Sequence, residues 1–408
     1  MNNPRKSVTL EQAWSAVDGE VGPADATARM VPAADAVGRV LQADQHARLD
    51  LPPFDKSAMD GYAICPGDQR QEYRLLTTVQ AGQTPAEPLA PGCTVKVMTG
   101  APVPAGTGQV IMREYTEEVG STVRVLRHGG APNICLHGED TRVGDLILSA
   151  GRVITPADAA NLISCGILEV PVAERVRIAI ISTGDEIVDD PSQIVPGKIM
   201  DSNGPMLAAL SAEWGLEVVR QLRAPDDLAV TVAVLRDALE AADIVAISGG
   251  VSVGDFDYVL AAMDEVGLDR RFDSVAIKPG KPTVFALPSG PSESGKVVFG
   301  LPGNPVSSFV MFHIFVLRAA ARMRGGDWPL RQIRFPMAGS FRRRKADRLA
   351  FIPAGIDDEG RVQPLQYHGS AHLLALGQAD GLFQVPIGVS ELSPGDDVIF
   401  TPLRSLMP

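Results

Sequence analysis

One short stretch constrains the fold more than any other: an apolar run at residues 243–247 that leads directly into a glycine-rich, polar loop. The run is short, rich in β-branched residues and free of polar alternation, which predicts a strand buried on both faces. The adjacent Gly249 and Gly250 allow a tight turn and a close approach of the backbone to a ligand. The other polar or glycine positions of this loop are Ser248, Ser252, Gly254, Asp255 and Asp257.

The residues of this loop leave two interpretations open. It can be a strand-to-helix turn without a ligand, because Gly-Gly pairs are common in turns. Alternatively, its backbone N–H groups and hydroxyls form a nest for a phosphate, and the carboxylates beyond them hold a cation that neutralises that phosphate. Two serines and two aspartates within a few residues favour the functional loop.

A second loop of the same kind lies further along the chain. Residues 300–307 read Gly-Leu-Pro-Gly-Asn-Pro-Val-Ser, follow an apolar strand at 296–299 and precede a long apolar helix. Between the two loops, Lys278 and Lys281 flank a Pro-Gly turn. These lysines either bind an anion or are the solvated charges of an exposed hairpin. Their place beside the glycine-rich end of the predicted sheet favours the anion.

From residue 176 onward, strands alternate with helices. This order predicts a mainly parallel sheet covered by helices on both faces, a three-layer α/β domain. In such a sheet, ligand-binding loops gather at the carboxyl ends of the strands. The expected strands are 176–181, 217–222, 243–247 and 296–299. Helices are expected at 203–214 and 257–266. A further helix is expected to be capped by Pro225-Asp226-Asp227 and to end near Ala242.

The regions on either side are rich in short strands. Residues 75–125 alternate short strands with Gly/Pro turns, and residues 332–408 return to that pattern. Acidic turns at 55–60 and 138–141 are either sets of Asx turns or carboxylates presented to a ligand. The expected organisation is therefore an N-terminal region at 1–175, an α/β domain at 176–326 and a C-terminal β domain at 327–408.

Composition narrows the classes of function. The 37 Lys and Arg against 49 Asp and Glu leave a net charge of −12, which argues against nucleic acid as a partner. The four cysteines form no Cys-x-x-Cys pair, and His368 and His372 lie in a glycine-rich segment, so no zinc site is expected. The sequence shows neither an apolar signal region nor an apolar run of about 18 residues, and we expect a cytoplasmic protein without a membrane span.

Six motifs in a fixed order resemble one family, the molybdopterin molybdenumtransferases, called MoeA in bacteria and the E domain of gephyrin in animals. The resemblance extends over nearly the whole chain. The motifs are Asp55-Lys-Ser-Ala-Met-Asp-Gly-Tyr62, Met98-Thr-Gly-Ala-Pro102, Ser182-Thr-Gly-Asp-Glu186, Ser248-Gly-Gly-Val-Ser-Val-Gly254 with Asp257, Lys278-Pro-Gly-Lys-Pro282 and Leu301-Pro-Gly-Asn-Pro305.

The resemblance implies a homodimer whose chains have two N-terminal lobes, one of them β-rich, a molybdopterin-binding α/β domain and a C-terminal β-barrel-like domain. It implies an enzyme of molybdenum cofactor biosynthesis. Adenylylated molybdopterin and molybdate are the implied substrates, molybdenum is inserted at the dithiolene, and AMP is released. Mg²⁺ or a similar divalent ion is the implied cofactor, and a molybdopterin adenylyltransferase is the implied partner that hands over the substrate.

The family's site residues carry over by position. Catalytic roles are implied for Asp60, Thr99, Asp140, Glu186, Asp227, Asp257, Lys278 and Lys281, with Glu186, Asp227 and Asp257 as metal ligands. Binding of the substrates is implied for Thr183, Gly184, Asp185, Ser248, Gly249, Gly250, Ser252, Gly254, Pro302, Gly303, Asn304, Ser307, Arg348 and Ser370. Asp60, Thr99 and Asp140 are expected to reach the site across the dimer.

The chain departs from the family pattern at Ser274 and Pro353, where basic residues are expected, and at Leu374 and Ala375, where a serine pair is expected. The lost hydroxyls predict weak molybdate affinity that improves in the double variant Leu374→Ser/Ala375→Ser.

Two other classes of function remain. The α/β domain alone also resembles molybdopterin adenylyltransferases and a nucleotide hydrolase, but the long N- and C-terminal regions argue against both. A non-catalytic molybdopterin-binding scaffold is the other class, and the presence of Asp60, Asp257 and both lysines argues against it.

Overall fold

The computed structural model describes residues 7–23, 28–251, 258–289, 295–326 and 332–403. The chain forms two compact units, which are described one at a time. Unit 1 comprises Met1–Arg29 and Ala173–Pro408, and unit 2 comprises Met30–Val172.

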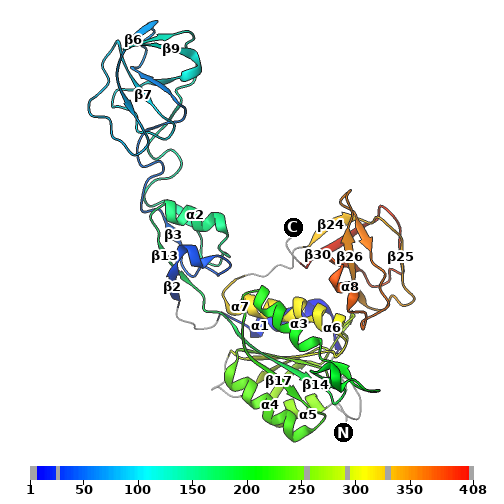
Figure 1. The fold of residues 1–408 in the computed structure, drawn as a ribbon. Coiled ribbons are helices and arrows are strands. Elements are labelled where there is room, and N and C mark those ends of the chain that lie inside the picture. Colours follow the sequence, from blue (N-terminus) through cyan, green and yellow to red (C-terminus); the bar gives the residue numbers. More distant parts are fainter. Residues whose placement is uncertain (1–6, 24–27, 252–257, 290–294, 327–331, 404–408) are drawn as a thin grey trace. The chain divides into compact units, whose positions relative to one another are not determined.

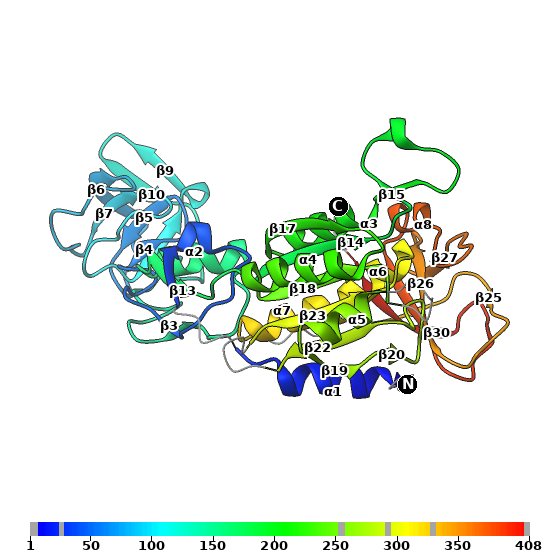
Figure 2. The ribbon, with the colours of Figure 1, turned by 90° about the horizontal axis from the view of Figure 1, so that it is seen from below.

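Unit 1 is built around a six-stranded sheet in the order β17-β14-β18-β23-β22-β19 (Figure 2). The first four strands are parallel, and β22 and β19 continue the sheet antiparallel at one edge. The strands are β14 (Arg177–Thr183), β17 (Glu217–Ala224), β18 (Ile244–Ser248), β19 (Leu268–Phe272), β22 (Val284–Pro288) and β23 (Val297–Leu301). The α/β class expected from the sequence is confirmed.

Alternate residues of the central strands enter two separate hydrophobic clusters. In β14, Ile178 and Ile180 belong to the cluster beneath α1, α3, α6 and α7, whereas Ala179 and Ile181 belong to the cluster beneath α4 and α5. Figure 1 shows these two groups of helices on opposite faces of the sheet. The helices are α1 (Leu10–Glu20), α3 (Asn203–Glu213), α4 (Leu228–Ala241), α5 (Tyr258–Glu265), α6 (Pro305–Met311) and α7 (Leu317–Met323).

The first helix belongs to the core of unit 1, not to the N-terminal region at 1–175 in which the sequence analysis placed it. Its residues Leu10, Ala13 and Val17 are buried in the same cluster as α7. Arg318 of α7 donates to both carboxylate oxygens of Asp18, with 2.8 Å between Nε and Oδ1. The amphipathic pattern of residues 10–17 predicts this helix, but its packing partner lies some 300 residues further along the chain.

One continuous helix runs from α6 through a π-helical turn, η5 (Phe312–Val316), into α7. By length and composition alone, this segment, Pro305–Met323, is long and apolar enough to cross a membrane. However, 83% of its most apolar window is buried inside the protein. Its apolar character is therefore accounted for by its packing against the sheet.

The C-terminal part of unit 1 forms a second sheet, in the order β21-β26-β28-β30-β24. Figure 1 labels β26, β30 and β24 of this sheet. The first strand, β21, comes from the α/β region and pairs in parallel with β26, so the two parts share hydrogen bonds. The elements are β21 (Ile277–Lys278), β24 (Ile333–Pro336), β25 (Phe341–Arg342), β26 (Leu349–Ile356), β27 (Val362–Pro364), α8 (Leu374–Gly377), β28 (Gly381–Val385), β29 (Glu391–Leu392) and β30 (Asp397–Pro402).

Short elements complete unit 1. The segment between β15 and β16 projects from the body of the unit in Figure 2. These elements are β1 (Ser7–Val8), β15 (Ile187–Val188), η3 (Pro191–Gln193), β16 (Ile199–Met200) and β20 (Ser274–Val275).

Unit 2 contains a six-stranded sheet in the order β8-β5-β7-β6-β10-β9 and a smaller region around α2. The N-cap Thr155 and Asp158 form a capping box at the start of α2. The elements are β2 (Arg29–Pro32), η1 (Ala33–Ala36), β3 (Gln45–His46), β4 (Lys56–Ser57), β5 (Gly61–Ile64), β6 (Glu72–Val79), β7 (Cys93–Val97), β8 (Gln109–Met112), η2 (Arg113–Tyr115), β9 (Thr116–Val119), β10 (Thr122–Val125), β11 (Ile134–Cys135), β12 (Leu146–Leu148), α2 (Pro156–Ser164) and β13 (Glu169–Val172).

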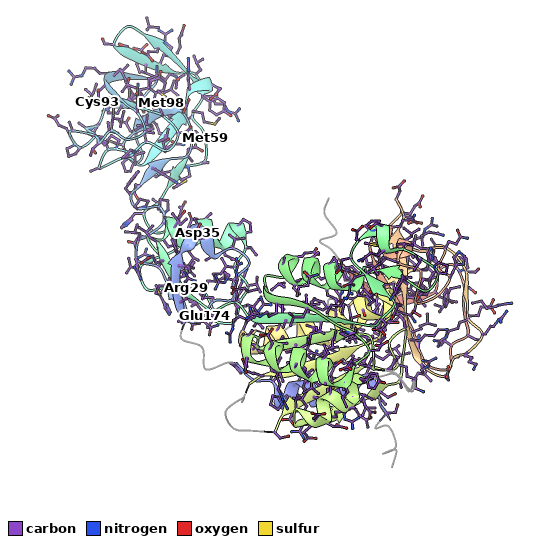
Figure 3. The ribbon with its side chains drawn as sticks, turned by 60° about the horizontal axis from the view of Figure 1, so that its bottom comes forward. Arg29, Asp35, Met59, Cys93, Met98 and Glu174 are labelled. Carbon is purple, nitrogen blue, oxygen red and sulfur yellow. The ribbon has the colours of Figure 1, made fainter. Side chains whose placement is uncertain are left out.

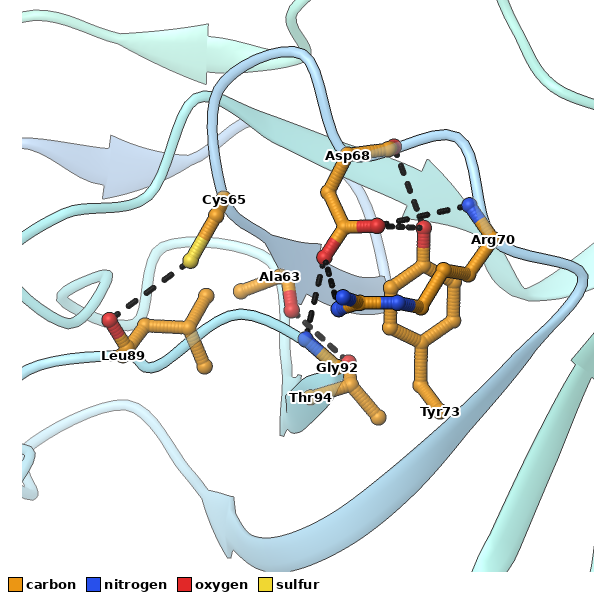
Figure 4. A network of polar contacts seen from close by, with 8 residues as sticks. All are labelled: Ala63, Cys65, Asp68, Arg70, Tyr73, Leu89, Gly92 and Thr94. Carbon is orange, nitrogen blue, oxygen red and sulfur yellow. Dashed lines mark hydrogen bonds and ion pairs between the residues drawn. The ribbon is translucent and has the colours of Figure 1, made fainter.

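A polar network centred on Asp68 holds the loops at one end of this sheet (Figure 4). The Asp68 carboxylate accepts hydrogen bonds from the backbone N–H groups of Gly92 and Arg70 and from the Tyr73 hydroxyl. Arg70 also forms an ion pair with it at 3.0 Å. Burial and the neighbouring Asp68 raise the pKa of Tyr73 to about 12, so this hydroxyl remains a donor. These contacts give the network a structural role.

Candidate functional site

A cavity of about 730 Å³ opens in unit 1 where β14, β18 and β23 end, the position at which parallel sheets bind ligands. Its walls come from both glycine-rich loops and from the C-terminal part of the unit. They are formed by Thr183, Gly184, Glu186, Ile187, Ile199, Met200, Asp201, Ser202, Asn203, Asp226, Ser248, Gly249, Gly250, Val251, Pro282, Pro302, Gly303, Asn304, Pro305, Ala371 and Leu373. The structure thus brings together eight of the predicted binding residues (Thr183, Gly184, Ser248, Gly249, Gly250, Pro302, Gly303 and Asn304) and the predicted catalytic residue Glu186.

The Gly249-Gly250 turn requires glycine at both positions. Both residues have positive φ angles, 98° and 64°, which side-chain-bearing residues rarely adopt. A Cβ atom on Gly249 would lie 2.7 Å from the Thr183 hydroxyl oxygen, and one on Gly250 would lie 2.6 Å from a methyl group of Val259. The absence of side chains therefore lets the backbone form this part of the cavity wall.

The second loop, Pro302-Gly303-Asn304, precedes the N-terminus of α6. The backbone N–H of Val306 in the first turn of this helix is bonded to the carbonyl oxygen of Ser370, 3.0 Å away. The predicted residue Ser307 is buried in the same turn, and neither it nor Ser370 lines the cavity. Ala371 and Leu373, which follow Ser370, do line it, so the C-terminal part of unit 1 closes one side.

Among the described residues, three carboxylates lie on the cavity wall: Glu186, Asp201 and Asp226. The predicted metal ligand Asp227 does not line it; its carboxylate accepts the backbone N–H of Val230 at 2.9 Å and caps α4. The backbone N–H of the predicted binding residue Asp185 donates to the carboxylate of Asp226, and the backbone N–H of Asp226 donates to the carboxylate of Asp185. At this position the carboxylate on the cavity wall is Asp226, one residue before the predicted metal ligand Asp227.

The predicted basic residues lie on the segment next to the cavity. Lys278 and Lys281 are exposed and outside its wall, whereas Pro282, directly after them, is part of it. Arg348 donates a hydrogen bond to the carbonyl oxygen of Ile277 at 3.4 Å, which places it beside the lysine-bearing segment. Lys278 and Arg348 therefore lie where β21 and β26 pair, and Lys281 follows Lys278 by three positions in the chain.

The four departures from the family pattern lie outside the cavity wall. Ser274 is buried in β20, and Pro353 is buried in β26. Leu374 is 77% exposed, and Ala375, its neighbour in α8, is 2% exposed. This placement gives no support to the expected effect of Leu374 and Ala375 on molybdate binding.

Asn203 and Asp201 are cavity residues that the sequence analysis missed. Asn203 is the first residue of α3, and its side chain bonds to Ser248 and to the backbone of Gly303. The run Asp201-Ser202-Asn203-Gly204 before an apolar helix is the signal that was available, because polar residues there commonly satisfy helix N-termini.

In unit 2, the structure brings Asp60 and Thr99 together. One oxygen of the exposed Asp60 carboxylate accepts both the backbone N–H and the hydroxyl of Thr99, at 2.8 and 2.7 Å. These two bonds lower the pKa of Asp60 below its ordinary value. Figure 3 labels Met59 and Met98, the residues that precede Asp60 and Thr99 in the sequence. Asp140 is also exposed, and its backbone N–H donates to the carbonyl of Leu51.

Four residues of the first glycine-rich loop, Ser252, Gly254, Asp255 and Asp257, lie outside the described residues. Within the described part of the chain, no three His, Cys, Asp or Glu side chains form a metal-binding group.

Comparisons with known proteins agree with this arrangement throughout the chain. The sequence profile of the MoeA N-terminal region (domain I and II) matches residues 8–166. The profile described as a probable molybdopterin binding domain matches residues 179–322, and that of the MoeA C-terminal region (domain IV) matches residues 338–403.

Named relatives are similar over most of their length. The molybdopterin molybdenumtransferase of Staphylococcus aureus (strain Mu50) is 34% identical over 382 residues, which cover 90% of this chain and 89% of the relative. That of Staphylococcus epidermidis is 31% identical over 390 residues, covering 91% and 90%. The crystal structure of the molybdopterin biosynthesis moeA protein from Pyrococcus horikoshii OT3 matches with a TM-score of 0.82 and 30% identity, covering 97% of this chain and all of that one.

The fold and the cavity thus define a multidomain protein whose α/β part is a molybdopterin-binding domain. The chain belongs to the molybdopterin molybdenumtransferase family, that of MoeA.

Proposed function

We propose that this chain is a molybdopterin molybdenumtransferase, which inserts molybdenum from molybdate into adenylylated molybdopterin and releases AMP. The observation that carries the proposal is the cavity at the strand ends, bounded by both glycine-rich loops and three carboxylates, in a chain similar to named transferases over 90% of its length. Because the similarity includes the N- and C-terminal regions, it favours this activity over an adenylyltransferase or hydrolase that shares the α/β domain alone.

The two glycine-rich loops supply the binding surface for the substrate's phosphates. Gly249, Gly250 and Gly303 have no side chains, so a ligand can approach their backbone closely. A charged phosphate at these loops gains directional bonds that hold it in place and exclude water. Lys278, Lys281 and Arg348, beside the cavity, supply positive charge for molybdate, a dianion.

The cavity residues fit a bound divalent cation such as Mg²⁺. Mg²⁺ is usually held by one or two carboxylates together with substrate phosphates and water, so a cluster of three protein ligands is not required. Glu186 and Asp226 are the described candidates on the wall, and Asp257 is the predicted third ligand. When bound, the ion neutralises charge on the phosphates as the adenylate bond breaks.

Further parts of the proposal come from the family resemblance. We propose a cytoplasmic homodimer in which Asp60, Thr99 and Asp140 of one chain complete the site of the other, and an adenylyltransferase that hands over the substrate. The fixed Asp60–Thr99 pair supports a role for this turn, because its carboxylate is exposed and ionised.

The test is an assay of AMP release from adenylylated molybdopterin with and without molybdate and Mg²⁺. We expect release that depends on both, together with formation of the molybdenum-bearing cofactor. A protein that binds the substrate but releases no AMP under these conditions would be a scaffold. Formation of adenylylated molybdopterin from ATP and free molybdopterin, with release of pyrophosphate, would indicate an adenylyltransferase.

A further inference from the structure

The side chain of Asn203 joins the two glycine-rich loops. Its amide nitrogen donates one hydrogen bond to the Ser248 hydroxyl at 2.8 Å and another to the carbonyl oxygen of Gly303 at 2.7 Å. Ser248 is the last residue of β18, directly before Gly249, and Gly303 lies in the turn after β23. Asn203 itself begins α3 and is only 8% exposed. One buried side chain therefore links three elements at the cavity.

The direction of these bonds is fixed by a chain of hydroxyls. The Ser308 hydroxyl donates to the carbonyl oxygen of Pro302. In its 3.1 Å contact with Ser248, Ser308 is therefore the acceptor and Ser248 the donor. With its proton used in this way, the Ser248 hydroxyl must accept from Asn203. Only a side chain with two N–H donors in one group satisfies both Ser248 and Gly303, and a carboxylate of the same shape cannot.

Stability alone does not account for an asparagine at this position. Its amide oxygen is buried and has no hydrogen-bond partner among the described residues. A buried acceptor without a partner lowers the free energy of unfolding. The residue is therefore suited to holding the loops rather than to filling the core.

We propose that Asn203 is a positioning residue that keeps the Gly249-Gly250 loop and the Pro302-Gly303 turn at the separation that adenylylated molybdopterin requires. The two loops approach closely: a Cβ on Gly303 would lie 3.5 Å from the Cα of Gly249. The backbone groups of both loops can act on one phosphate only while this spacing is kept. The inference rests on the proposed function, because it names how the substrate site is held in shape.

The experiment compares Asn203→Asp and Asn203→Ala with Ser211→Ala. Ser211 is fully buried on the same helix, and its hydroxyl donates to the carbonyl of Leu207 at 2.7 Å, away from the cavity wall. The Ser211 variant therefore measures what the loss of a buried hydrogen bond in α3 does without touching the loops. Thermal unfolding, the Kd of adenylylated molybdopterin, and the KM and kcat of AMP release are measured for each protein.

We expect both Asn203 variants to raise the Kd and KM at least about ten-fold while kcat changes less, because the loops bind the substrate before and during the reaction. The Asp variant should be the weaker binder, since its carboxylate faces the Gly303 carbonyl. The Ser211 variant should keep its affinity at a similar loss of thermal stability. The Ala variant adds no charge and serves as the test if the Asp variant does not fold.

Affinity within about two-fold of the unchanged protein in Asn203→Ala would overturn the inference, as would an equal loss of affinity in Ser211→Ala. An unchanged protein that binds the substrate but releases no AMP would contradict the proposed function alone, because the comparison of Kd values still decides the role of Asn203.

Discussion

Thr99 donates two hydrogen bonds to a single oxygen of Asp60, one from its backbone N–H and one from its hydroxyl. The backbone bond is the larger cause of the lowered pKa of Asp60, and the hydroxyl bond is the second. Because the pKa is lowered, the carboxylate stays ionised as the pH falls through the ordinary value of 3.8. The pair thus presents a fixed negative charge on an exposed turn.

The variant Thr99→Val removes the hydroxyl and keeps the backbone donor. We expect the pKa of Asp60 to rise part of the way toward its ordinary value, measured by NMR titration of the carboxyl carbon. Asp190, whose pKa is lowered mainly by the backbone N–H of Ser192, should not move and serves as the control. At pH 7 both proteins have an ionised Asp60, so a loss of AMP release there reports on its orientation. An unchanged titration curve for Asp60 would show that the hydroxyl bond does not form in solution.

The variant Gly249→Ala tests whether the backbone of the first loop shapes the cavity. The new Cβ would lie 2.7 Å from the Thr183 hydroxyl oxygen in a residue with φ of 98°. The control is Gly267→Ala, because Gly267 also has a positive φ, 80°, but has nothing within 4 Å of the new Cβ. Each change costs about 1–3 kcal/mol of backbone strain. We expect only Gly249→Ala to lose substrate binding, measured by calorimetry; equal affinity in both variants would contradict the role assigned to this loop.

Structural features that depend on residues close together in the sequence, such as strands, helices and helix caps, can be predicted from the sequence. The strand and helix order after residue 176 and the helix cap at Pro225-Asp226-Asp227 are both confirmed. The metal-ligand role of Asp227 is implied by the family resemblance alone, because a carboxylate before a helix can cap that helix or face a ligand and the local pattern does not distinguish the two. In the structure Asp227 caps the helix, and its neighbour Asp226 lines the cavity.

What the sequence does not predict are contacts between distant segments. Asn203 joins Ser248 and Gly303, which lie 45 and 100 positions away, and no local pattern encodes these partners. The first helix likewise finds Arg318 some 300 positions along the chain, so its amphipathic pattern predicts a helix but not the unit to which it belongs. Such partners are fixed only when the sheet assembles and brings the strand ends together.

His313 should make the stability of unit 1 dependent on pH. It is buried in η5, its Nδ1 donates to the carbonyl of Phe309, and burial lowers its pKa from 6.5 to about 4. The unfolded chain therefore binds a proton that the folded chain does not between these two pH values, and the free energy of unfolding falls as the pH falls through this window. The loss approaches about 3 kcal/mol at pH 4 from this group alone, at 1.36 kcal/mol per pKa unit.

The measurement is urea unfolding at pH 7.5, 5.5 and 4.5, with tryptophan fluorescence as the signal. Trp214 is a suitable reporter because its ring packs edge to face against the His313 ring, with 6.4 Å between the ring centroids. The variant His313→Leu should lose much of the pH dependence, whereas His368→Gln, a change at an exposed histidine, should keep it. Equal pH dependence in the His313 variant and in the unchanged protein would show that other groups cause it.

The double variant Leu374→Ser/Ala375→Ser is now expected to leave the molybdate dependence of AMP release unchanged. Neither residue lines the cavity: Leu374 is exposed to solvent, and Ala375 is buried in α8. The hydroxyl added at 375 enters a buried position and should lower thermal stability. A lower KM for molybdate in the double variant would restore the prediction made from the family pattern.

A mixture of two inactive variants tests the proposed shared site of the homodimer. Asp60→Ala removes the charged turn of unit 2, and Gly249→Val blocks the cavity of unit 1. If Asp60 of one chain completes the cavity of the other, each mixed dimer has one site with both parts intact. Random mixing yields half mixed dimers, so about a quarter of the unchanged protein's activity should return. Each variant incubated with itself is the control. If Asp60 instead serves its own chain's cavity, every site in the mixed dimer carries one defect and AMP release stays at the level of the controls.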